Sequence, residues 1–401
     1  MLKINKGLNL SKKIFKFVDL FAGIGGFHFA LHQLGGECVF ASEIDDDSRI
    51  TYERNFNDIS PNLFKKDLLD NSLFNKDIRT ISPNEIPDFD VLCAGFPCQP
   101  FSQAGYKKGF SDNQDSERGN LFFNLVDIIN TKRPKAFFLE NVRGIVNHDG
   151  GKTFRIIREI LEEELKYSFY YNVVKASDFG LPQHRPRTFM IGFRDENLLR
   201  GFTFPNPVPL KFNMSDVFGG SCSREIGFTL RVGGAGSNIN DRRNWDSYLV
   251  NNEVVRIQPN HALKIQGFPD NFKLPNSKSK AMKQLGNSVA IDAVKAYAKE
   301  MIDYMHQLDK KANRQNTSEI KKNKGEWSEL YTFLKLILDK KIYFSDSLSN
   351  TKYDFVQINQ ITNLNLNETV KILSNGNYEV YDQNNRKLHH TTFAEKDLNL
   401  I

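Results

Sequence analysis

The sequence predicts an α/β fold in which a parallel sheet is covered by helices on both faces. Short apolar runs alternate with amphipathic segments along the first half of the chain, and a glycine-rich turn follows the first apolar run. Hydrophobic residues make up 40% of the 401 residues, which is enough for a large core. A chain of this length also has room for two or three domains.

The first elements predict a strand–helix–strand unit. Residues 15–20 form a short apolar run that leads into the glycine-rich segment AGIGG. A helical pattern over 27–34 follows, and a second apolar run, CVFASE at 38–43, ends in an acid. Apolar runs joined through a glycine turn and a helix are typical of a βαβ unit.

The same alternation continues to residue 193. Strands are expected at 90–96, 135–142 and 188–193, and amphipathic helices at 121–130 and 153–165. Repeated strand–helix alternation of this kind favours a parallel sheet.

The pattern changes after about residue 195. Pro, Gly and Asn become frequent over 195–283, which predicts a smaller, loop-rich domain. Residues 284–302 restore a helical pattern, and we expect that helix to return to the first domain, which then comprises 14–194 and 284–305. A basic linker is expected at 306–324. A C-terminal extension follows at 325–401, with an amphipathic stretch at 326–338.

Charge and cysteine content limit the class of protein. The net charge of +6 and the pI of about 8.9 are compatible with a polyanionic partner without requiring one. The four cysteines form no CxxC pair, and no His/Cys cluster has zinc spacing, so we expect neither a disulfide framework nor a metal site. With no secretory signal and no membrane span, we expect a soluble protein of a reducing cytoplasm.

The glycine-rich turn predicts an adenosine-type site. Gly23, Gly25 and Gly26 lie between a strand and a helix, where glycines allow a tight turn and close approach of a ligand. Glu43 ends the next strand, where a carboxylate can bind ribose hydroxyls, and Asp67 could accept a bond from an adenine amino group. The motif alone leaves three alternatives: nicotinamide dinucleotide, S-adenosylmethionine, and a turn without a ligand.

A cysteine in the segment GFPCQPFSQAG (95–105) is a candidate nucleophile. Cys98 follows an expected strand, and Pro97 and Pro100 stiffen the backbone around it. It could act as a nucleophile or be a structural cysteine, because the sequence does not show the environment that would lower its pKa. Cys93 lies inside the strand, and we expect it to be a buried, inert thiol. Cys38 and Cys222 are interpreted in the same way.

Two further motifs carry polar groups at strand ends. Glu140, in LENVRG (139–144), could hydrogen-bond the ring nitrogen of a pyrimidine, although a lone loop acid is also common. Arg185 and Arg187 precede the last strand. Residues two apart on an extended chain share a face, so we expect both guanidiniums to point one way, toward a phosphate or a base carbonyl. The alternative is a pair of surface arginines.

Taken in order, these motifs resemble a known family. The series FVDLFAGIGGF, SEID, GFPCQPFS, ENV, QHRPR, IQGFPDNF and QLGNSVA is similar to that of the cytosine carbon-5 DNA methyltransferases, over about residues 15–302. The resemblance implies a Rossmann-like, S-adenosylmethionine-dependent methyltransferase domain. It also implies a small target-recognition domain and a final helix that returns to the large domain.

The resemblance also implies roles for single residues. Cys98 falls on the nucleophile, Glu140 on the acid, and Arg185 and Arg187 on the paired arginines. The base would be flipped out of the duplex, and residues 101–119 match the mobile loop that closes over it. The expected contacts to S-adenosylmethionine are Phe21, Gly23, Gly25, Glu43, Asp67, Pro97, Asn287 and Ser288. The expected contacts to DNA are Gln99, Ser102, Lys107, Lys108, Arg231, Arg242 and Arg243.

The C-terminal segment carries a second resemblance. Residues 323–346 look like the start of HpaII-type restriction endonucleases, which cut CCGG. This implies a methyltransferase joined to the opening part of a nuclease in a restriction-modification system, and it favours CCGG as the methylated site. A plain accessory helix is the alternative. No acidic-plus-lysine nuclease site is recognisable, so we expect no cleavage. The expected partners are double-stranded DNA, bound by a monomer, and a cognate restriction endonuclease.

Three other functions agree less well with these motifs. A nicotinamide-dependent oxidoreductase would not need Cys98, Glu140 and the two arginines together. An RNA cytosine-5 methyltransferase would share the same core, but the recognition segment and the nuclease-like tail favour DNA. The presence of both Cys98 and Glu140 argues against a DNA-binding protein with an inactive site.

Overall fold

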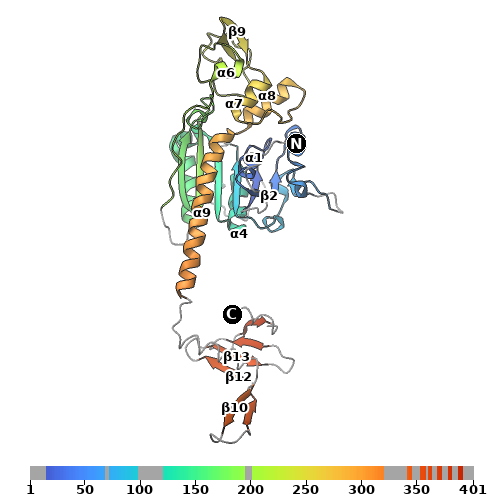
Figure 1. Ribbon diagram of the computed structural model, residues 1–401, viewed down its shortest axis with the longest axis vertical. Coiled ribbons are helices and arrows are strands. Elements are labelled where there is room, and N and C mark those ends of the chain that lie inside the picture. Colours follow the sequence, from blue (N-terminus) through green and yellow to red (C-terminus); the bar gives the residue numbers. More distant parts are fainter. Residues whose placement is uncertain are drawn as a thin grey trace. The chain divides into compact units, whose positions relative to one another are not determined.

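A seven-stranded sheet organises the first of the chain's two units, Met1–Lys310 (Figure 1). The structure, a computed structural model, describes residues 15–67, 72–97, 121–194 and 201–319, and six strands between residues 341 and 391. The strand order is β3-β2-β1-β4-β5-β7-β6. The strands are β1 (Phe15–Leu20), β2 (Gly36–Ser42), β3 (Phe74–Asn75), β4 (Val91–Gly95), β5 (Ala136–Val142), β6 (Ser168–Val174) and β7 (Arg187–Phe193).

The sheet is mixed, so the expectation of an entirely parallel sheet was wrong for one strand. β7 pairs antiparallel with both β5 and β6, whereas the pairs among β1 to β5 are parallel. Only the loop 175–186, with one 3₁₀ turn, joins β6 to β7, and a parallel crossover ordinarily needs a helix. As a result, Arg187 at the start of β7 pairs with Val142 at the end of β5.

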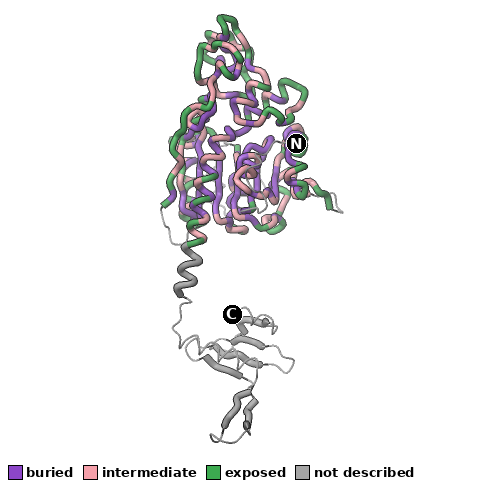
Figure 2. The backbone as a smooth tube through the Cα atoms, in the orientation of Figure 1, coloured by how far each residue is buried: buried purple, intermediate pink, exposed green. Residues whose placement is uncertain are grey.

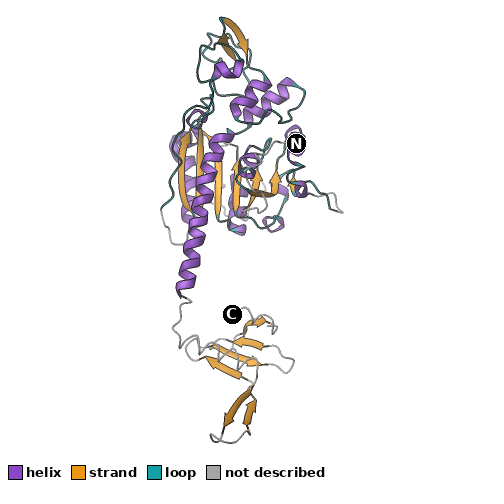
Figure 3. Cartoon of the chain, in the orientation of Figure 1, coloured by secondary structure: helices purple, strands orange, loops and turns teal. Residues whose placement is uncertain are grey.

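Helices cover both faces of the sheet (Figure 3). On one face lie α1 (Gly26–His32), α2 (Asp46–Phe56) and α9 (Ile291–Glu319), whose Phe27, Tyr52 and Tyr297 are buried in one core cluster with Phe138 and Phe189 of the sheet. On the other face lie α4 (Leu121–Lys132) and α5 (Lys152–Glu159), which continues as one π-helical segment, Ile160–Glu164. The core therefore has two layers, one on each side of the sheet.

The region after β7 is rich in loops, as the composition predicts. It holds α6 (Met214–Phe218), the hairpin β8 (Ser247–Val250) and β9 (Glu253–Arg256), α7 (Pro259–Gln266) and α8 (Lys278–Asn287). Asn251 and Asn252 both have positive φ, the conformation of a two-residue hairpin turn. Exposed residues are frequent in this region, whereas the residues of the seven-stranded sheet are largely buried (Figure 2).

The helical pattern over 284–302 corresponds to two helices rather than one. α8 ends at Asn287 and α9 begins at Ile291, and Ser288 between them has an extended backbone (φ −73°, ψ 170°). α9 then continues to Glu319, so residues 306–319 of the expected linker are helical. The physical reason is that this stretch, although basic, contains neither Pro nor Gly to end the helix. The amphipathic stretch 326–338 lies outside the described residues.

3₁₀ turns complete the first unit: η1 (Pro61–Leu63), η2 (Ile78–Thr80), η3 (Pro83–Glu85), η4 (Arg143–Gly151) and η6 (Ala176–Asp178).

In the second unit, Lys311–Ile401, β10 (Lys341–Ser345) pairs antiparallel with β11 (Tyr353–Gln357). A four-stranded antiparallel sheet has its strands in chain order: β12 (Gln360–Asn363), β13 (Glu368–Ile372), β14 (Tyr378–Tyr381) and β15 (Lys387–Thr391). None of the helices in the described ranges has the length and apolarity needed to cross a bilayer.

Candidate functional site

The turn between β1 and α1 places backbone in unusual conformations. Phe21 (φ 54°), Gly23 (φ 56°) and Gly25 (φ 86°) all have left-handed φ, and Gly25 is the N-cap of α1. A Cβ on Gly25 would lie 2.2 Å from the ring of Phe56, so only glycine fits there. A Cβ on Gly23 would meet nothing within 4 Å, so that side of the turn is open.

The Glu43 carboxylate closes the other side of this turn. Its Oε2 accepts a hydrogen bond from the Gly23 N–H (2.7 Å), and its Oε1 accepts one from the Asp45 N–H (2.8 Å). Burial raises the pKa of Glu43, and these two bonds oppose that rise. Each oxygen still has a lone pair to accept a further bond. The structure therefore brings together the glycine turn and the acid that directly follows β2.

Ile44 was not singled out by the sequence reasoning. The residue is 58% exposed although it lies only two residues after Ser42, the buried last residue of β2. The sequence could have indicated this residue, because an apolar side chain next to an acid at a strand end can pack against the flat ring of a bound ligand.

Of the remaining expected cofactor contacts, Ser288 lies against this turn. Ser288 is buried, and a Cβ on Gly26 would lie 3.1 Å from its Oγ, so the α8–α9 junction lies against the glycine turn. The Ser288 Oγ has no hydrogen-bond partner among the described residues. Asp67, Pro97 and Asn287 are exposed.

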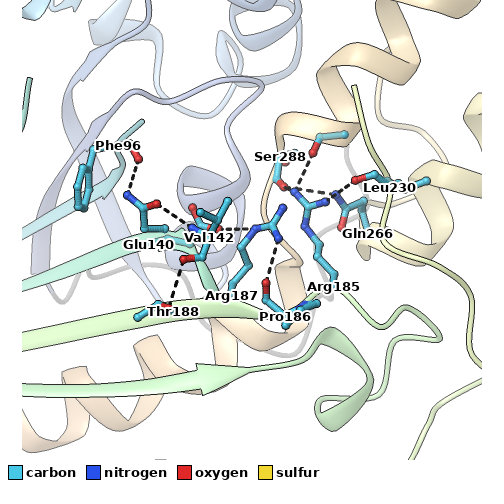
Figure 4. A network of polar contacts seen from close by, with 12 residues as sticks. Phe96, Glu140, Val142, Arg185, Pro186, Arg187, Thr188, Leu230, Gln266 and Ser288 are labelled. Atoms are coloured by element: carbon cyan, nitrogen blue, oxygen red, sulfur yellow. Dashed lines mark hydrogen bonds and ion pairs between the residues drawn. The ribbon is translucent and has the colours of Figure 1, made fainter. Parts of the chain in front are cut away.

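Glu140 and Arg187 form a buried ion pair at the carboxyl edge of the sheet (Figure 4). The Arg187 Nε lies 2.9 Å from Glu140 Oε1, and the two side chains are 17% and 12% exposed. Burial raises the pKa of Glu140, although the positive charges of Arg187 and Arg185 oppose this. A carboxyl of this kind can carry a proton closer to neutral pH than an exposed glutamate can.

The other carboxylate oxygen of Glu140 faces the end of β4. A Cβ on Gly95 would lie 3.4 Å from Glu140 Oε2. Next to it, the Asn141 Nδ2 donates to the Phe96 carbonyl (2.9 Å) and ties the ends of β4 and β5 together. Cys98 comes two residues after Phe96 in the chain and lies outside the described residues, as do Gln99, Ser102, Lys107 and Lys108.

Arg185 and Arg187 have different hydrogen-bond partners, although their side chains extend in the same direction (Figure 4). Arg185 is 2% exposed, and its guanidinium donates to the carbonyls of Leu230 (3.3 Å), Gly286 (2.9 Å) and Ser288. Arg187 instead contacts Glu140 and the Pro186 carbonyl (3.0 Å).

The arginines expected to contact DNA are all exposed. Arg243 is held by Asp241, with 2.8 Å between Nη2 and Oδ2, and its hydrogen bond lowers the pKa of Asp241 to about 2. Arg231 and Arg242 lie in the same stretch of loop, which begins beside the buried Leu230.

Cys93 is fully buried, as predicted, and burial raises the pKa of its thiol well above the ordinary range. Cys38 behaves in the same way, and Cys222 is half-buried. Cys93 and Cys38 are therefore poor nucleophiles. The parts of the chain that the structure describes hold no group of three His, Cys, Asp or Glu side chains suited to a metal ion.

Comparison with known proteins identifies the class. Residues 15–225 and 224–303 match the model of the C-5 cytosine-specific DNA methylases, and residues 323–401 match that of the HpaII restriction endonuclease. Type II methyltransferase M.DsaV of Dactylococcopsis salina is 37% identical, over 74% of this chain and 88% of the relative. M.HpaII of Haemophilus parainfluenzae is also 37% identical, over 75% and 92%.

Solved structures agree on the fold. A DNMT2 mutant from Spodoptera frugiperda superposes with a TM-score of 0.54 at 18% identity, over 72% of this chain and 99% of the other. A putative DNA modification methyltransferase of E. coli gives 0.53 at 20% identity, over 72% and 98%. The fold and the relatives together define a methyltransferase of the α/β class. The chain belongs to the C-5 cytosine-specific DNA methylase family.

Proposed function

We propose that this DNA cytosine methylase uses Cys98 as its nucleophile, Glu140 as its acid and S-adenosylmethionine as its methyl donor. The observation that carries the proposal is the buried Glu140–Arg187 pair, which faces the end of β4 three residues before Cys98. The reaction at a pyrimidine ring requires an acid of raised pKa and a cysteine nucleophile.

The proposed chemistry starts at Cys98. Its thiolate adds to cytosine carbon-6, while the Glu140 carboxyl hydrogen-bonds ring nitrogen N3 and stabilises the charge that develops there. Arg187 holds Glu140 in place through its ion pair. Carbon-5 becomes nucleophilic and takes the methyl group. Loss of the carbon-5 proton, to water, then expels the cysteine thiolate and restores the ring.

S-adenosylmethionine would supply the methyl group from its sulfonium. The β1–α1 turn fits an adenosine ligand, because Gly23 has open space beside it and Glu43 keeps acceptor capacity. The buried Ser288 Oγ without a partner among the described residues also suits a polar ligand group. We assign Glu43 to the ribose hydroxyls, Asp67 to the adenine amino group and Ile44 to the adenine face. Phe21, Gly25, Pro97 and Asn287 complete the proposed site.

Recognition of the target is assigned to the region 195–283, and catalysis to 14–194 and 284–305. Reaction at carbon-5 requires the cytosine to leave the duplex stack. Phosphate contacts supply affinity, and contacts to base edges supply sequence choice. We assign these contacts to Gln99, Ser102, Lys107, Lys108, Arg231, Arg242 and Arg243. The site proposed is CCGG, supported by the match of residues 323–401 to the HpaII restriction endonuclease.

Transfer of radiolabel from S-adenosylmethionine tests the proposal. Duplex DNA with CCGG sites, duplex DNA without them, and tRNA would be offered to the wild type and to Cys98→Ala. Label on cytosine carbon-5 of the CCGG duplex, for the wild type only, is the expected result. Label on duplexes without CCGG would contradict CCGG as the target sequence. Label on tRNA alone would favour the RNA methyltransferase, and no label on any substrate would contradict the proposed donor or reaction.

A further inference from the structure

Leu230 lies in a buried polar junction that the proposed reaction does not use. Its N–H donates to Gln183 Oε1 (3.2 Å), and its carbonyl accepts from Arg185 Nη1 (3.3 Å). Both backbone polar groups of this one residue are thus held by side chains from the turn ahead of β7. Gln183, Arg185 and Leu230 are each at most 2% exposed, so water does not compete for these bonds.

The same two side chains hold the helices that follow. Gln183 Nε2 donates to the Ile265 carbonyl (3.2 Å) and to Gln266 Oε1 (3.0 Å), at the end of α7. Arg185 Nη2 donates to the carbonyls of Gly286 and Ser288, where α8 ends. We call Gln183, Arg185, Leu230, Gln266 and Ser288 together the Leu230 junction (Figure 4 shows all of these except Gln183).

An exposed loop begins directly after Leu230. Residues 231–236 are all exposed, yet this recognition loop, residues 231–243, is fastened at several points. Trp245 Nε1 donates to the Gly233 carbonyl (3.0 Å), and Asp246 Oδ2 accepts from the Gly236 N–H (3.1 Å). A Cβ on Gly286 would lie 2.9 Å from the Arg231 carbonyl, so the loop base also packs closely on α8.

A buried arginine at this position is costly, which indicates that its geometry is needed. Burial lowers the pKa of the Arg185 guanidinium; Arg187 adds to this effect and Glu140 opposes it. An uncompensated buried charge is strongly unfavourable, and here three carbonyl groups offset the cost. A planar guanidinium can reach several acceptors at fixed angles, whereas a lysine ammonium cannot.

We propose that Arg185 and Gln183 are positioning residues that set the recognition loop relative to Glu140, and thereby set sequence selectivity. This inference rests on the proposed function. Arg185 is two residues from Arg187, which is bonded to Glu140, so a short length of chain links the acid to the base of the loop. A loop that shifts relative to the flipped base would accept neighbouring sequences.

The test compares the sequence selectivity of variants on a duplex library with a randomised segment. Bisulfite sequencing would report which cytosines the wild type, Arg185→Lys and Gln183→Met have methylated. Both variants should lose about tenfold in discrimination between the preferred site and its single-base neighbours, equivalent to about 1.4 kcal/mol. Leu161→Ala, in the buried core on the α5 face of the sheet, is the matched control that loses stability without touching the junction.

A second measurement does not depend on methyl transfer. Amide hydrogen exchange of peptides spanning residues 228–236 should become at least about tenfold faster in Arg185→Lys and stay unchanged in Leu161→Ala. Unchanged selectivity in folded Arg185→Lys and Gln183→Met protein would overturn the inference. If the wild type methylates nothing, the proposed function fails, and the exchange result then decides alone whether Arg185 holds the loop.

Discussion

Arg187 and Glu140 meet because the strands that carry them run in opposite directions. The Arg187 Nε lies 2.9 Å from Glu140 Oε1, and in the sheet Arg187 at the start of β7 pairs with Val142 at the end of β5. In a parallel arrangement the start of β7 would lie at the opposite edge of the sheet. The antiparallel direction of β7 therefore places the Arg187 guanidinium next to the Glu140 carboxylate.

Glu140→Gln should lower methyl transfer by at least about a hundredfold, since an amide cannot supply the acidic proton near N3. Binding of S-adenosylmethionine should stay within about twofold of the wild type, because Glu43 lies at a different strand end. Single-turnover transfer and calorimetric titration measure the two effects. Equal losses in transfer and in cofactor affinity would argue against a role at the base.

Arg187→Met should destabilise the protein more at pH 8 than at pH 5. Burial raises the pKa of Glu140 and Arg187 opposes this rise, so the variant should have a still higher folded-state pKa. The folded state then binds more protons than the unfolded state, and stability falls as pH rises from about 4.5 through the folded pKa. We expect a loss of about 3 kcal/mol at pH 8, measured by urea unfolding. Arg187→Lys should recover part of it.

Glu43→Gln should weaken S-adenosylmethionine binding by about tenfold or more, through the loss of a charged acceptor for ribose hydroxyls. Affinity for duplex DNA should not change. Glu53→Gln, an exposed position on α2, is the matched control. A variant that binds the cofactor as tightly as the wild type would remove Glu43 from the proposed site.

Gly25→Ala should cost more stability than Gly23→Ala. Both positions have left-handed φ, which costs an alanine about 1 kcal/mol. Only at Gly25 would the added Cβ collide with the Phe56 ring, at 2.2 Å. Thermal unfolding should therefore rank wild type above Gly23→Ala and Gly23→Ala above Gly25→Ala. The reverse order of the two variants would contradict the packing described for this turn.

His28 should make the fold acid-sensitive. It is fully buried between Tyr52 (2.7 Å) and Ser60 (3.1 Å), and burial lowers its pKa well below 6.5. Below pH 6.5 the unfolded chain takes up a proton that the folded chain does not, so stability falls with decreasing pH. The fall should approach about 1.4 kcal/mol per pH unit. His28→Gln should make the free energy of unfolding less dependent on pH between pH 7.5 and 5.5. An unchanged slope in the variant would mean that groups other than His28 cause the acid sensitivity.

Local patterns predicted the first half of the fold well. The strand over 15–20, the glycine turn and the strand after it appear within one or two residues of their expected limits. These elements depend on apolar runs and turn residues that are neighbours in the chain. The buried state of Cys93 followed from the same kind of pattern.

Long-range pairing was not predictable in the same way. The direction of β7 depends on the length of its connection to β6, a strand that the sequence reasoning missed although SFYYNVV is rich in aromatic and β-branched residues. The partners of Arg185 lie 45, 101 and 103 residues away in the chain, and no local pattern indicates them. α9 extends to Glu319 because no Pro or Gly ends it earlier. The many basic residues of this stretch led to the prediction of a linker instead.

The central claim, covalent attack by Cys98 on a cytosine, is tested most directly with duplex DNA in which the target base is 5-fluorocytosine. Fluorine at carbon-5 cannot leave as a proton does, so the enzyme should remain bonded to carbon-6 after methyl transfer. We predict a denaturant-stable protein–DNA adduct for the wild type and for Cys93→Ala, dependent on S-adenosylmethionine, and none for Cys98→Ala. An adduct formed equally by Cys98→Ala, or no adduct in protein that methylates the unmodified duplex, would contradict the account.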